Sequence, residues 1–167
     1  MSARAAWRLE SLGFPQVYRY TAGKADWFAA GLPREGTQAH TPRAAGAARR
    51  DTPTCRLTDT VGDVRDAVRA AGWELCIVVN EARIVLGRLR KDAFAADRQT
   101  HVEAVMEAGP TTFRPDVPLD ELTERLRTRH VQSVVVSTSD GELIGVLFRD
   151  EAEQRLQREP ATTTATT

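Results

Sequence analysis

Two aspartates occupy matching places in two similar stretches of the chain. The stretches read VLGRLRKD, which ends at Asp92, and LIGVLFRD, which ends at Asp150, so each aspartate follows a glycine by five places. Each one begins a segment of helical composition, where a carboxylate can either cap the helix or accept hydrogen bonds from a bound ligand. Arg90, Lys91 and Arg149 stand beside the aspartates and could contact an anionic group. Capping and ligand contact both stay open at this point.

The cysteines and histidines do not combine into a reactive or metal-binding group. Cys55 and Cys76 form no CxxC pair and have no histidine nearby. Cys76 lies in an apolar run, so we expect a small core residue, and we expect both thiols to be reduced. His40, His101 and His130 have no partner in the sequence that would make a base or a metal ligand. The sequence therefore predicts no catalytic residue, no cofactor and no metal.

The composition is that of an ordinary cytoplasmic protein. Of the 167 residues 41% are hydrophobic, enough for a real core, and 23 basic side chains balance 23 acidic ones. Because the net charge is zero, the electrostatic signature of a nucleic-acid-binding protein is missing. The longest apolar run has five residues, against about 20 for a membrane span, and the first residues lack the apolar core of a signal peptide. We expect a cytoplasmic protein that binds neither nucleic acid nor membrane.

The similarity of the two stretches extends over a repeated unit. At an offset of 58 residues, apolar side chains recur at i, i+3 and i+7, which predicts an amphipathic helix in each copy: Val61, Val64 and Val68, then Leu119, Leu122 and Leu126. Thr60 and Asp63 form a capping-box pattern for the first helix, and Gly72 ends it. Pro118 suits the first turn of the second helix.

Each predicted helix is followed by a predicted hairpin. The runs LCIVV and SVVVS are rich in β-branched residues, and each leads through a short turn into a second apolar run. Asp140 and Gly141 are a strong turn signal for the second hairpin, and NEA is a weaker one for the first. Helical segments then start at Asp92 and Asp150.

TPTCRL and GPTTFR supply a leading strand for each copy. Matching Thr54 with Thr111 sets these strands one residue out of register with the rest of the repeat. We therefore predict an α/β (α+β) fold with two β-α-β-β-α repeats, residues 51–101 and 102–158.

Three segments lie outside the repeats. Residues 37–50 have no apolar periodicity and are expected to be a linker, and residues 159–167 have low complexity and are expected to be disordered. Residues 1–36 form a separate block. There we expect a helix, a strand and a short helix, at residues 2–12, 16–20 and 23–31.

The repeats resemble a tandem pair of CBS domains, the regulatory modules named after cystathionine beta-synthase. The resemblance covers about two-thirds of the chain and rests on the Val-x-x-Val-Met opening at Val102, the GPTTFRPD strand start, the VVVSTSDGELIGVL hairpin and the 58-residue spacing. It implies pseudo-twofold packing with two clefts that accept adenosine-containing ligands such as AMP, ATP or S-adenosylmethionine. It also implies a homodimer.

In that family the aspartate at the start of the closing helix contacts the ribose hydroxyls, and neighbouring groups contact phosphate or line the clefts. The ligand-binding residues that the resemblance implies are Asp92, Asp150, Arg90, Lys91, Arg149, Thr54, Thr111 and Thr112. Threonine is equally an ordinary strand residue. The family usually has Ser or Thr three places after the glycine and aspartate six places after it. Here Arg90 and Phe148 replace the hydroxyl residue, and Glu151 holds the sixth place in the second copy.

The N-terminal block resembles the C-terminal part of a rhodanese domain. Gly23, Trp27, Gly31 and Pro33 fit that family's Gly-x-x-x-Trp-x-x-x-Gly-like ending. Rhodanese sulfur transfer needs a low-pKa cysteine, which would fall before the first residue, and neither cysteine of the repeats can replace it. We expect no sulfurtransferase activity from this chain. Two origins of the block stay open: a start assigned at an internal methionine of a longer reading frame, or a degenerate remnant.

Three functions are compatible with these features. The first is a non-catalytic regulatory module that senses an adenosine-containing nucleotide. The second is part of a rhodanese-type sulfurtransferase regulated by a CBS pair, inactive here because the catalytic loop is missing. The third is a ligand-free dimerisation scaffold, which the departures at Arg90 and Phe148 favour.

Overall fold

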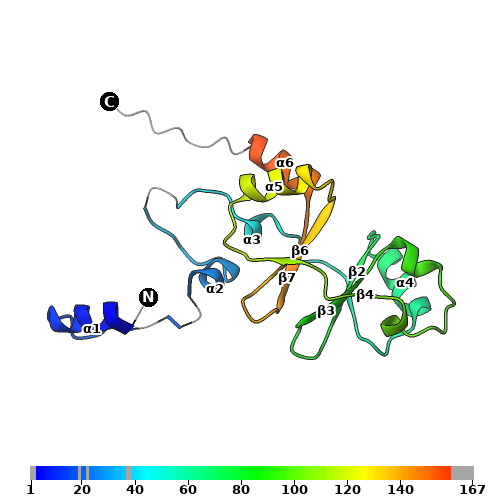
Figure 1. Ribbon diagram of the computed structural model, residues 1–167, viewed down its shortest axis with the longest axis horizontal. Coiled ribbons are helices and arrows are strands. Elements are labelled where there is room, and N and C mark those ends of the chain that lie inside the picture. The colour runs from blue at the N-terminus through cyan, green and yellow to red at the C-terminus, as the bar shows by residue number, and fades with distance from the viewer. Residues whose placement is uncertain (1–2, 19, 22, 37–38, 159–167) are drawn as a thin grey trace.

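Two lobes, each built on a small β-sheet, make up the body of the protein. The structure is a computed structural model that describes residues 3–18, 20–21, 23–36 and 39–158. The lobes lie side by side, with helices covering their outer faces (Figure 1). The predicted α/β (α+β) fold is confirmed. The expected disorder of residues 159–167 concerns residues outside the described ones.

The first lobe has a four-stranded sheet. Its strands lie in the order β1 (Thr54–Cys55), β2 (Cys76–Val79), β3 (Val85–Leu89) and β4 (Glu107–Ala108). β1 is parallel to β2, and the other pairs are antiparallel. Helix α4 (Val61–Ala70) and the 3-10 helices η1 (Lys91–Ala95) and η2 (Val102–Ala104) complete the lobe.

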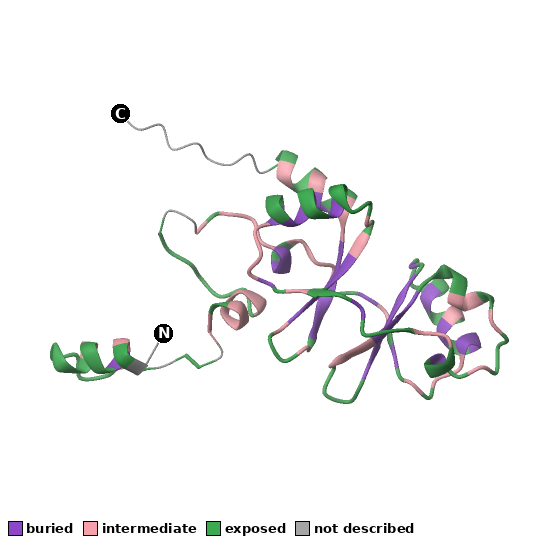
Figure 2. Ribbon diagram, in the orientation of Figure 1, coloured by how far each residue is buried: buried purple, intermediate pink, exposed green. Residues whose placement is uncertain are grey.

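The second lobe repeats this arrangement with three strands. β5 (Thr112–Phe113) is parallel to β6 (Ser133–Ser137), which is antiparallel to β7 (Leu143–Phe148). Helices α5 (Leu119–Thr128) and α6 (Arg149–Arg158) pack together on this lobe (Figure 1). Buried side chains gather on the strands and on the inner faces of the helices in both lobes (Figure 2).

The strand register repeats at 58 residues throughout. Thr54 pairs with Ile77 in the first sheet, and Thr112 pairs with Val135 in the second. Both hairpins also have an irregularity at the same place in the repeat. The prediction that matched Thr54 with Thr111 is therefore wrong by one residue, because proline positions, which do not set strand pairing, suggested it.

The segment just before the leading strand of each repeat pairs with the sheet of the other repeat. β4 pairs with β3, and at the equivalent place Arg49 bridges to Val146 on β7. The short helix α3 (Ala44–Ala47), which falls inside the stretch expected to be a linker, has buried alanines in the core of the second lobe. Residues 43–50 are thus packed, although no apolar periodicity marked them. The boundaries of the repeats stay predictions.

The glycine shared by both repeats is explained by these crossings. A Cβ on Gly87 would lie 2.5 Å from Met106 Sδ. A Cβ on Gly145 would overlap the carbonyl oxygen of Arg49 and lie 2.8 Å from its carbonyl carbon. Gly145 therefore needs a residue without a side chain, whereas a side chain at Gly87 would require Met106 to move.

The two amphipathic helices follow the sequence pattern closely. The predicted cap of α4 forms with Thr60 as the N-cap residue: Thr60 Oγ1 accepts a hydrogen bond from the Asp63 amide at 3.3 Å and donates to Asp63 Oδ2 at 2.9 Å. Gly72 follows the helix with φ of 72°, and His130 takes the same left-handed conformation after α5, with φ of 53°. Pro118 is the N-cap residue of α5, one place earlier than expected.

The two closing helices differ from each other. The helix expected from Asp150 is confirmed as α6, but the one expected from Asp92 is only the five-residue 3-10 helix η1. The chain after η1 must return to the start of α4, where the carbonyls of Arg98 and Thr100 accept hydrogen bonds from the first amides of α4 at 3.0 and 2.9 Å. That return path leaves no room for further helical turns.

The N-terminal block lies on the side of the second lobe that faces away from the first (Figure 1). Helices α1 (Ala3–Ser11) and α2 (Gly23–Ala29) form where helices are expected. The strand expected over residues 16–20 is wrong for the described residues 16–18 and 20, because no neighbouring strand is there to pair with it. α1 extends away from the lobes and is largely exposed (Figures 1 and 2). None of the helices in the described segments has the length and apolar content to cross a membrane.

Candidate functional site

Two of the predicted site residues line a cavity of the first lobe. Lys91 and Asp92 on η1 face the C-terminal half of α4 across a cavity of about 720 Å³. Arg65 and Arg69 contribute two further positive charges, and Trp73 and Phe94 contribute aromatic side chains. Glu74, which lies 3.9 Å from Lys91 Nζ, is a second carboxylate in the lining. Carboxylates, cations and aromatic rings are the groups that bind sugar hydroxyls, phosphates and a planar base.

Neither aspartate is the N-cap residue of its helix. The N-cap residue of η1 is Arg90, which makes no side-chain capping bond, and α6 begins at Arg149. Asp92 and Asp150 therefore lie inside the first turn, where a negative charge is favourable toward the helix dipole. The Asp150 carboxylate accepts hydrogen bonds from Arg149 at 3.3 and 3.4 Å. Capping by these two side chains, one of the two interpretations, is wrong.

Arg90, which was expected to contact phosphate, is engaged by a carboxylate of the crossing strand. Glu107 on β4 accepts a hydrogen bond from Arg90 Nε at 3.1 Å and two from Arg88 Nη2 at 2.9 and 3.0 Å. Arg88 is buried, with 8% of its side chain exposed, and its Nε has no hydrogen-bond partner among the described residues. Partial desolvation opposes ionisation of Glu107, but Arg88 and then Arg90 together lower the pKa of its carboxyl below the usual value.

The equivalent place in the second lobe is filled by Arg49. Its guanidinium carbon lies 4.1 Å from the centre of the Trp73 ring and 6.0 Å from that of Phe148. Its Nε and Nη2 donate to the two carboxylate oxygens of Asp51 at 3.2 and 2.7 Å, and Nη1 lies 3.6 Å from Glu151. Hydrogen bonding from Arg49 lowers the pKa of the Asp51 carboxyl. Phe148 and Glu151, the two positions that depart from the expected motif, thus both face a cation of the same chain.

No local signal in the sequence points to Arg49, because this residue falls in the stretch without apolar periodicity. A signal was available in the repeat itself. Residue 49 plus the offset of 58 is residue 107, so extending the repeat upstream would have matched Arg49 with Glu107.

The predicted threonines are not gathered at one place. Thr54 lines a cavity of about 310 Å³ beside Cys55 and Cys76, whereas Thr111 and Thr112 are exposed and line none of the cavities described here. The neighbouring Cys55 thiol and burial raise the pKa of the Cys76 thiol far above its ordinary value, which fits the predicted core role. In the part of the chain that the structure describes, no group of three or more His, Cys, Asp or Glu side chains could hold a metal ion.

Comparison with known proteins identifies the architecture. Residues 102–152 match the CBS domain family. The CBS domains of a transcriptional regulator from Streptococcus pneumoniae superpose with a TM-score of 0.62 and 22% identity, over 68% of this chain and 98% of that chain. The two repeats share the fold of a tandem CBS-domain pair. The 58-residue register shows that the first repeat has the same strand pairing as the second, which contains the residues that match the family.

Other CBS structures are similar to the same extent. The CBS domain pair of protein MJ0100, in complex with 5'-methylthioadenosine and S-adenosyl-L-methionine, gives a TM-score of 0.61 at 12% identity, over 71% of this chain and 98% of that chain. The cytosolic domain of the Mg²⁺ channel MgtE, in complex with ATP, gives 0.62 at 22% identity over 68% of this chain. The chain spans 48% of that MgtE domain. Comparison with curated proteins finds none that matches this sequence.

Proposed function

We propose that this chain is a non-catalytic regulatory module whose CBS pair binds one adenosine-containing nucleotide, through its first unit. The observation that carries the proposal is the cavity of about 720 Å³ at η1, which brings Asp92 and Lys91 together with aromatic and basic side chains. Its volume lies within the range of about 300–1,000 Å³ typical of small-molecule sites. The adenosine ligands of MJ0100 and MgtE support the ligand class.

Each group in this cavity has a role that suits such a ligand. The Asp92 carboxylate can accept hydrogen bonds from two vicinal hydroxyls, and Lys91 and Arg69 can approach a phosphate. Trp73 and Phe94 offer faces for a purine. In the second unit the corresponding carboxylate, Asp150, is held by Arg149. One nucleotide per chain is therefore expected.

Calorimetric titration with AMP, ATP and S-adenosylmethionine tests this assignment. Asp92→Ala removes hydrogen bonds to a charged group, which we expect to weaken binding by about 10- to 100-fold. Asp150→Ala is the matched control, because it removes the same group from the other unit, and its affinity should stay within about twofold of wild type. Unchanged binding in Asp92→Ala, or a stoichiometry of two, would reject the site.

A ligand-free scaffold is the second candidate, and Arg49 is the observation that favours it. The guanidinium lies over Trp73 of the first unit and Phe148 of the second, so the aromatic ring at the start of α6 is covered by the chain's own side chain. A thermal-shift screen separates the two functions. A ligand at 100 times its Kd stabilises the folded state by about 2.7 kcal/mol, or roughly 5–10 °C for a chain of this size. A screen in which no adenine compound shifts the Tm supports the scaffold.

Sulfur transfer is not part of the proposed function. Cys55 and Cys76 are buried in the first CBS unit, where a persulfide could not reach a substrate. The rhodanese resemblance of the N-terminal block stays a prediction. Assay of thiosulfate-to-cyanide transfer should give background rates, and any rate that Cys55→Ser or Cys76→Ser abolishes would contradict this conclusion.

A further inference from the structure

Exposed apolar side chains gather in the N-terminal block. Among the described residues, the large apolar side chains that are exposed all belong to this block, and none belongs to either lobe. Exposed apolar patches are small on a protein that works alone, and aromatic side chains are enriched where proteins bind each other. The block therefore has the composition of an interaction surface, formed by Trp7, Leu12, Phe14, Tyr18, Tyr20 and Leu32.

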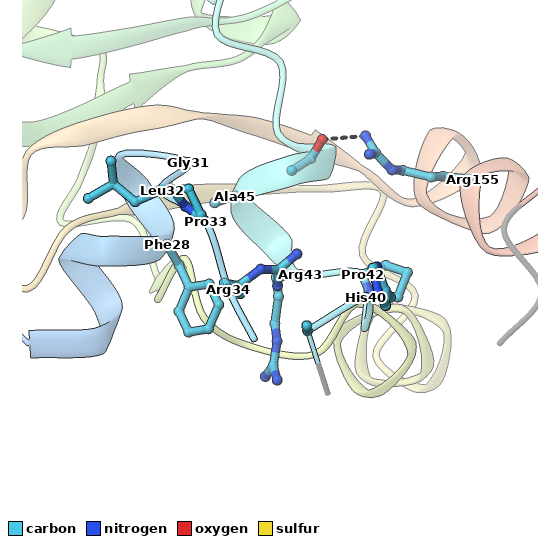
Figure 3. A pocket seen from close by; sticks show the side chains of 12 residues that line it. Phe28, Gly31, Leu32, Pro33, Arg34, His40, Pro42, Arg43, Ala45 and Arg155 are labelled. Carbon is cyan, nitrogen blue, oxygen red and sulfur yellow. Dashed lines mark hydrogen bonds between the residues drawn. The ribbon is translucent and has the colours of Figure 1, made fainter. Parts of the chain in front are cut away.

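The block is attached to the second lobe at α2, whereas α1 extends away from both lobes (Figure 1). Arg50 Nη2 donates a hydrogen bond to the carbonyl of Ala29, at the end of α2, at 2.8 Å. Phe28 of α2 lines a cavity together with Arg155 of α6 (Figure 3). Trp7, in the middle of α1, is 65% exposed. A helix of nine residues is too short to be stable on its own in water, so α1 needs packing that the lobes do not give it.

Two charges of α1 are placed against the helix dipole. Arg4 lies in the first turn and Glu10 in the last, the reverse of the placement that the dipole favours. Arg8 in the last turn is favourable toward the dipole, but it lies four places after Arg4, a spacing at which like charges repel. Arg4 and Glu10 are about 9 Å apart along the helix axis and about 120° apart around it, so they do not meet within one copy. One α1 helix thus offers neither charge a matching group of its own.

We propose that α1 binds α1 of a second copy of this chain, in antiparallel orientation and with Trp7 at the centre. Arg4 and Glu10 stand three places before and three places after Trp7. A twofold axis at Trp7 therefore sets Arg4 of each copy opposite Glu10 of the other, which gives two ion pairs. Each charge also lies beside the end of the other helix whose dipole favours it. The charges that are unfavourable in one copy are thus complementary in two.

The two Trp7 side chains cover each other at the twofold axis of this dimer. Tryptophan at the centre of an interface often contributes a large share of the binding energy. Leu12 and Phe14, which are 58% and 57% exposed, follow α1 directly and extend the apolar contact. This surface lies outside both CBS units, so the dimer leaves the cavity at η1 open.

Analytical ultracentrifugation of the full chain over a range of concentrations tests the proposal. Trp7→Ala removes the central side chain from both copies at once, and the dissociation constant of the dimer should rise about 100-fold. Arg4→Glu and Glu10→Arg each turn both ion pairs into like-charge pairs, and each single variant should dimerise about tenfold more weakly. The double variant Arg4→Glu with Glu10→Arg restores opposite charges and should dimerise within about threefold of wild type. An equimolar mixture of the two single variants should dimerise equally well, because their charges are complementary.

Matched controls separate α1 from the two lobes. Arg129→Glu reverses a charge at an exposed position of the second lobe and should leave the dissociation constant within about twofold of wild type. Asp92→Ala should leave it unchanged as well, so failure of the nucleotide site does not decide this proposal. Rescue by the double variant excludes misfolding as the reason why the single variants dimerise weakly. A wild-type chain that stays monomeric at every concentration, a dimer that Trp7→Ala leaves intact, single variants that the double variant does not rescue, or an equal loss in Arg129→Glu overturns the proposal.

Discussion

Replacing Gly145 with alanine tests whether the crossing segment at Arg49 is integral to the fold. The added Cβ would overlap the carbonyl oxygen of Arg49 and lie 2.8 Å from the carbonyl carbon. The obstacle is backbone, so relief requires the whole segment to move away from β7. Gly87 at the same place in the first repeat offers a matched comparison, because a Cβ there would meet the Met106 side chain, which can rotate away.

The free-energy cost of Gly145→Ala has two parts. Overpacking a filled site costs about 1–3 kcal/mol. Moving Arg49 also weakens the hydrogen bond from its amide to the Val146 carbonyl at 2.8 Å and the reverse bond at 3.1 Å, each contributing about 0.5–1.5 kcal/mol. We expect the free energy of unfolding to fall by about 3 kcal/mol for Gly145→Ala. Gly87→Ala should cost about 1 kcal/mol, since the Met106 thioether has several rotamers.

Urea unfolding followed by circular dichroism and by tryptophan fluorescence measures both values. Trp73 stacks against Arg49, so the fluorescence of Gly145→Ala should also change in the native state. If Gly145→Ala is as stable as Gly87→Ala, the crossing segment is not held against β7 as described, and the explanation of the shared glycine is wrong.

Four further predictions follow from the structure. Arg83→Gly and His130→Gly should each stabilise the fold by about 0.5–1 kcal/mol in urea unfolding, because these residues have φ of 59° and 53° and their counterparts 58 residues away are glycines. Cys76 should react with a thiol reagent at pH 8 only after unfolding, because its raised pKa keeps the thiol protonated in the folded chain. The unfolded thiol loses its proton above about pH 8.5, so the free energy of unfolding should fall as the pH rises beyond about 8.5. The lowered pKa of Glu107 gives the opposite pH dependence of stability. As the pH falls, the unfolded carboxyl takes up a proton near pH 4.3, before the folded one does, so the free energy of unfolding should fall below about that pH. The fall should be less steep in Glu107→Gln. Light scattering should give a homodimer, and a mass near 18.4 kDa at every concentration would contradict it.

Local patterns in the sequence predicted the elements that depend on local physics. The apolar stripe that begins at Val61 and its capping box define α4, and the stripe that begins at Leu119 defines α5. The β-branched runs predicted β2 and β6, and Asp140 with Gly141 predicted the turn before β7. The side-chain period decides which face of α4 and α5 is buried, whereas the continuous apolar run of β2 is buried on both faces.

The failures come from elements that depend on a partner elsewhere in the chain. A strand at residues 16–20 needs a neighbouring strand, and none is near it. The helix after β3 stops at Ala95 because the chain must return to α4. Arg49 pairs with Val146, almost a hundred residues away, and no window of the sequence shows that contact. The cavity of about 400 Å³ that Phe28 and Arg155 line was missed for the same reason, since these two residues are more than a hundred positions apart in the chain (Figure 3).

The two crossing residues explain why the CBS units are not equivalent in chemistry although they are equivalent in register. Arg49 and Glu107 occupy the same place in the repeat but carry opposite charges. Each has partners of the opposite charge close by. Glu107 draws Arg88 and Arg90 toward the sheet edge, away from the cavity at η1, whose lining does not include them. Arg49 instead lies over Phe148 and close to Glu151, at the start of α6. In the first unit, η1 therefore borders an open cavity. In the second unit, Arg49 covers the start of α6. This asymmetry favours one nucleotide per chain over two.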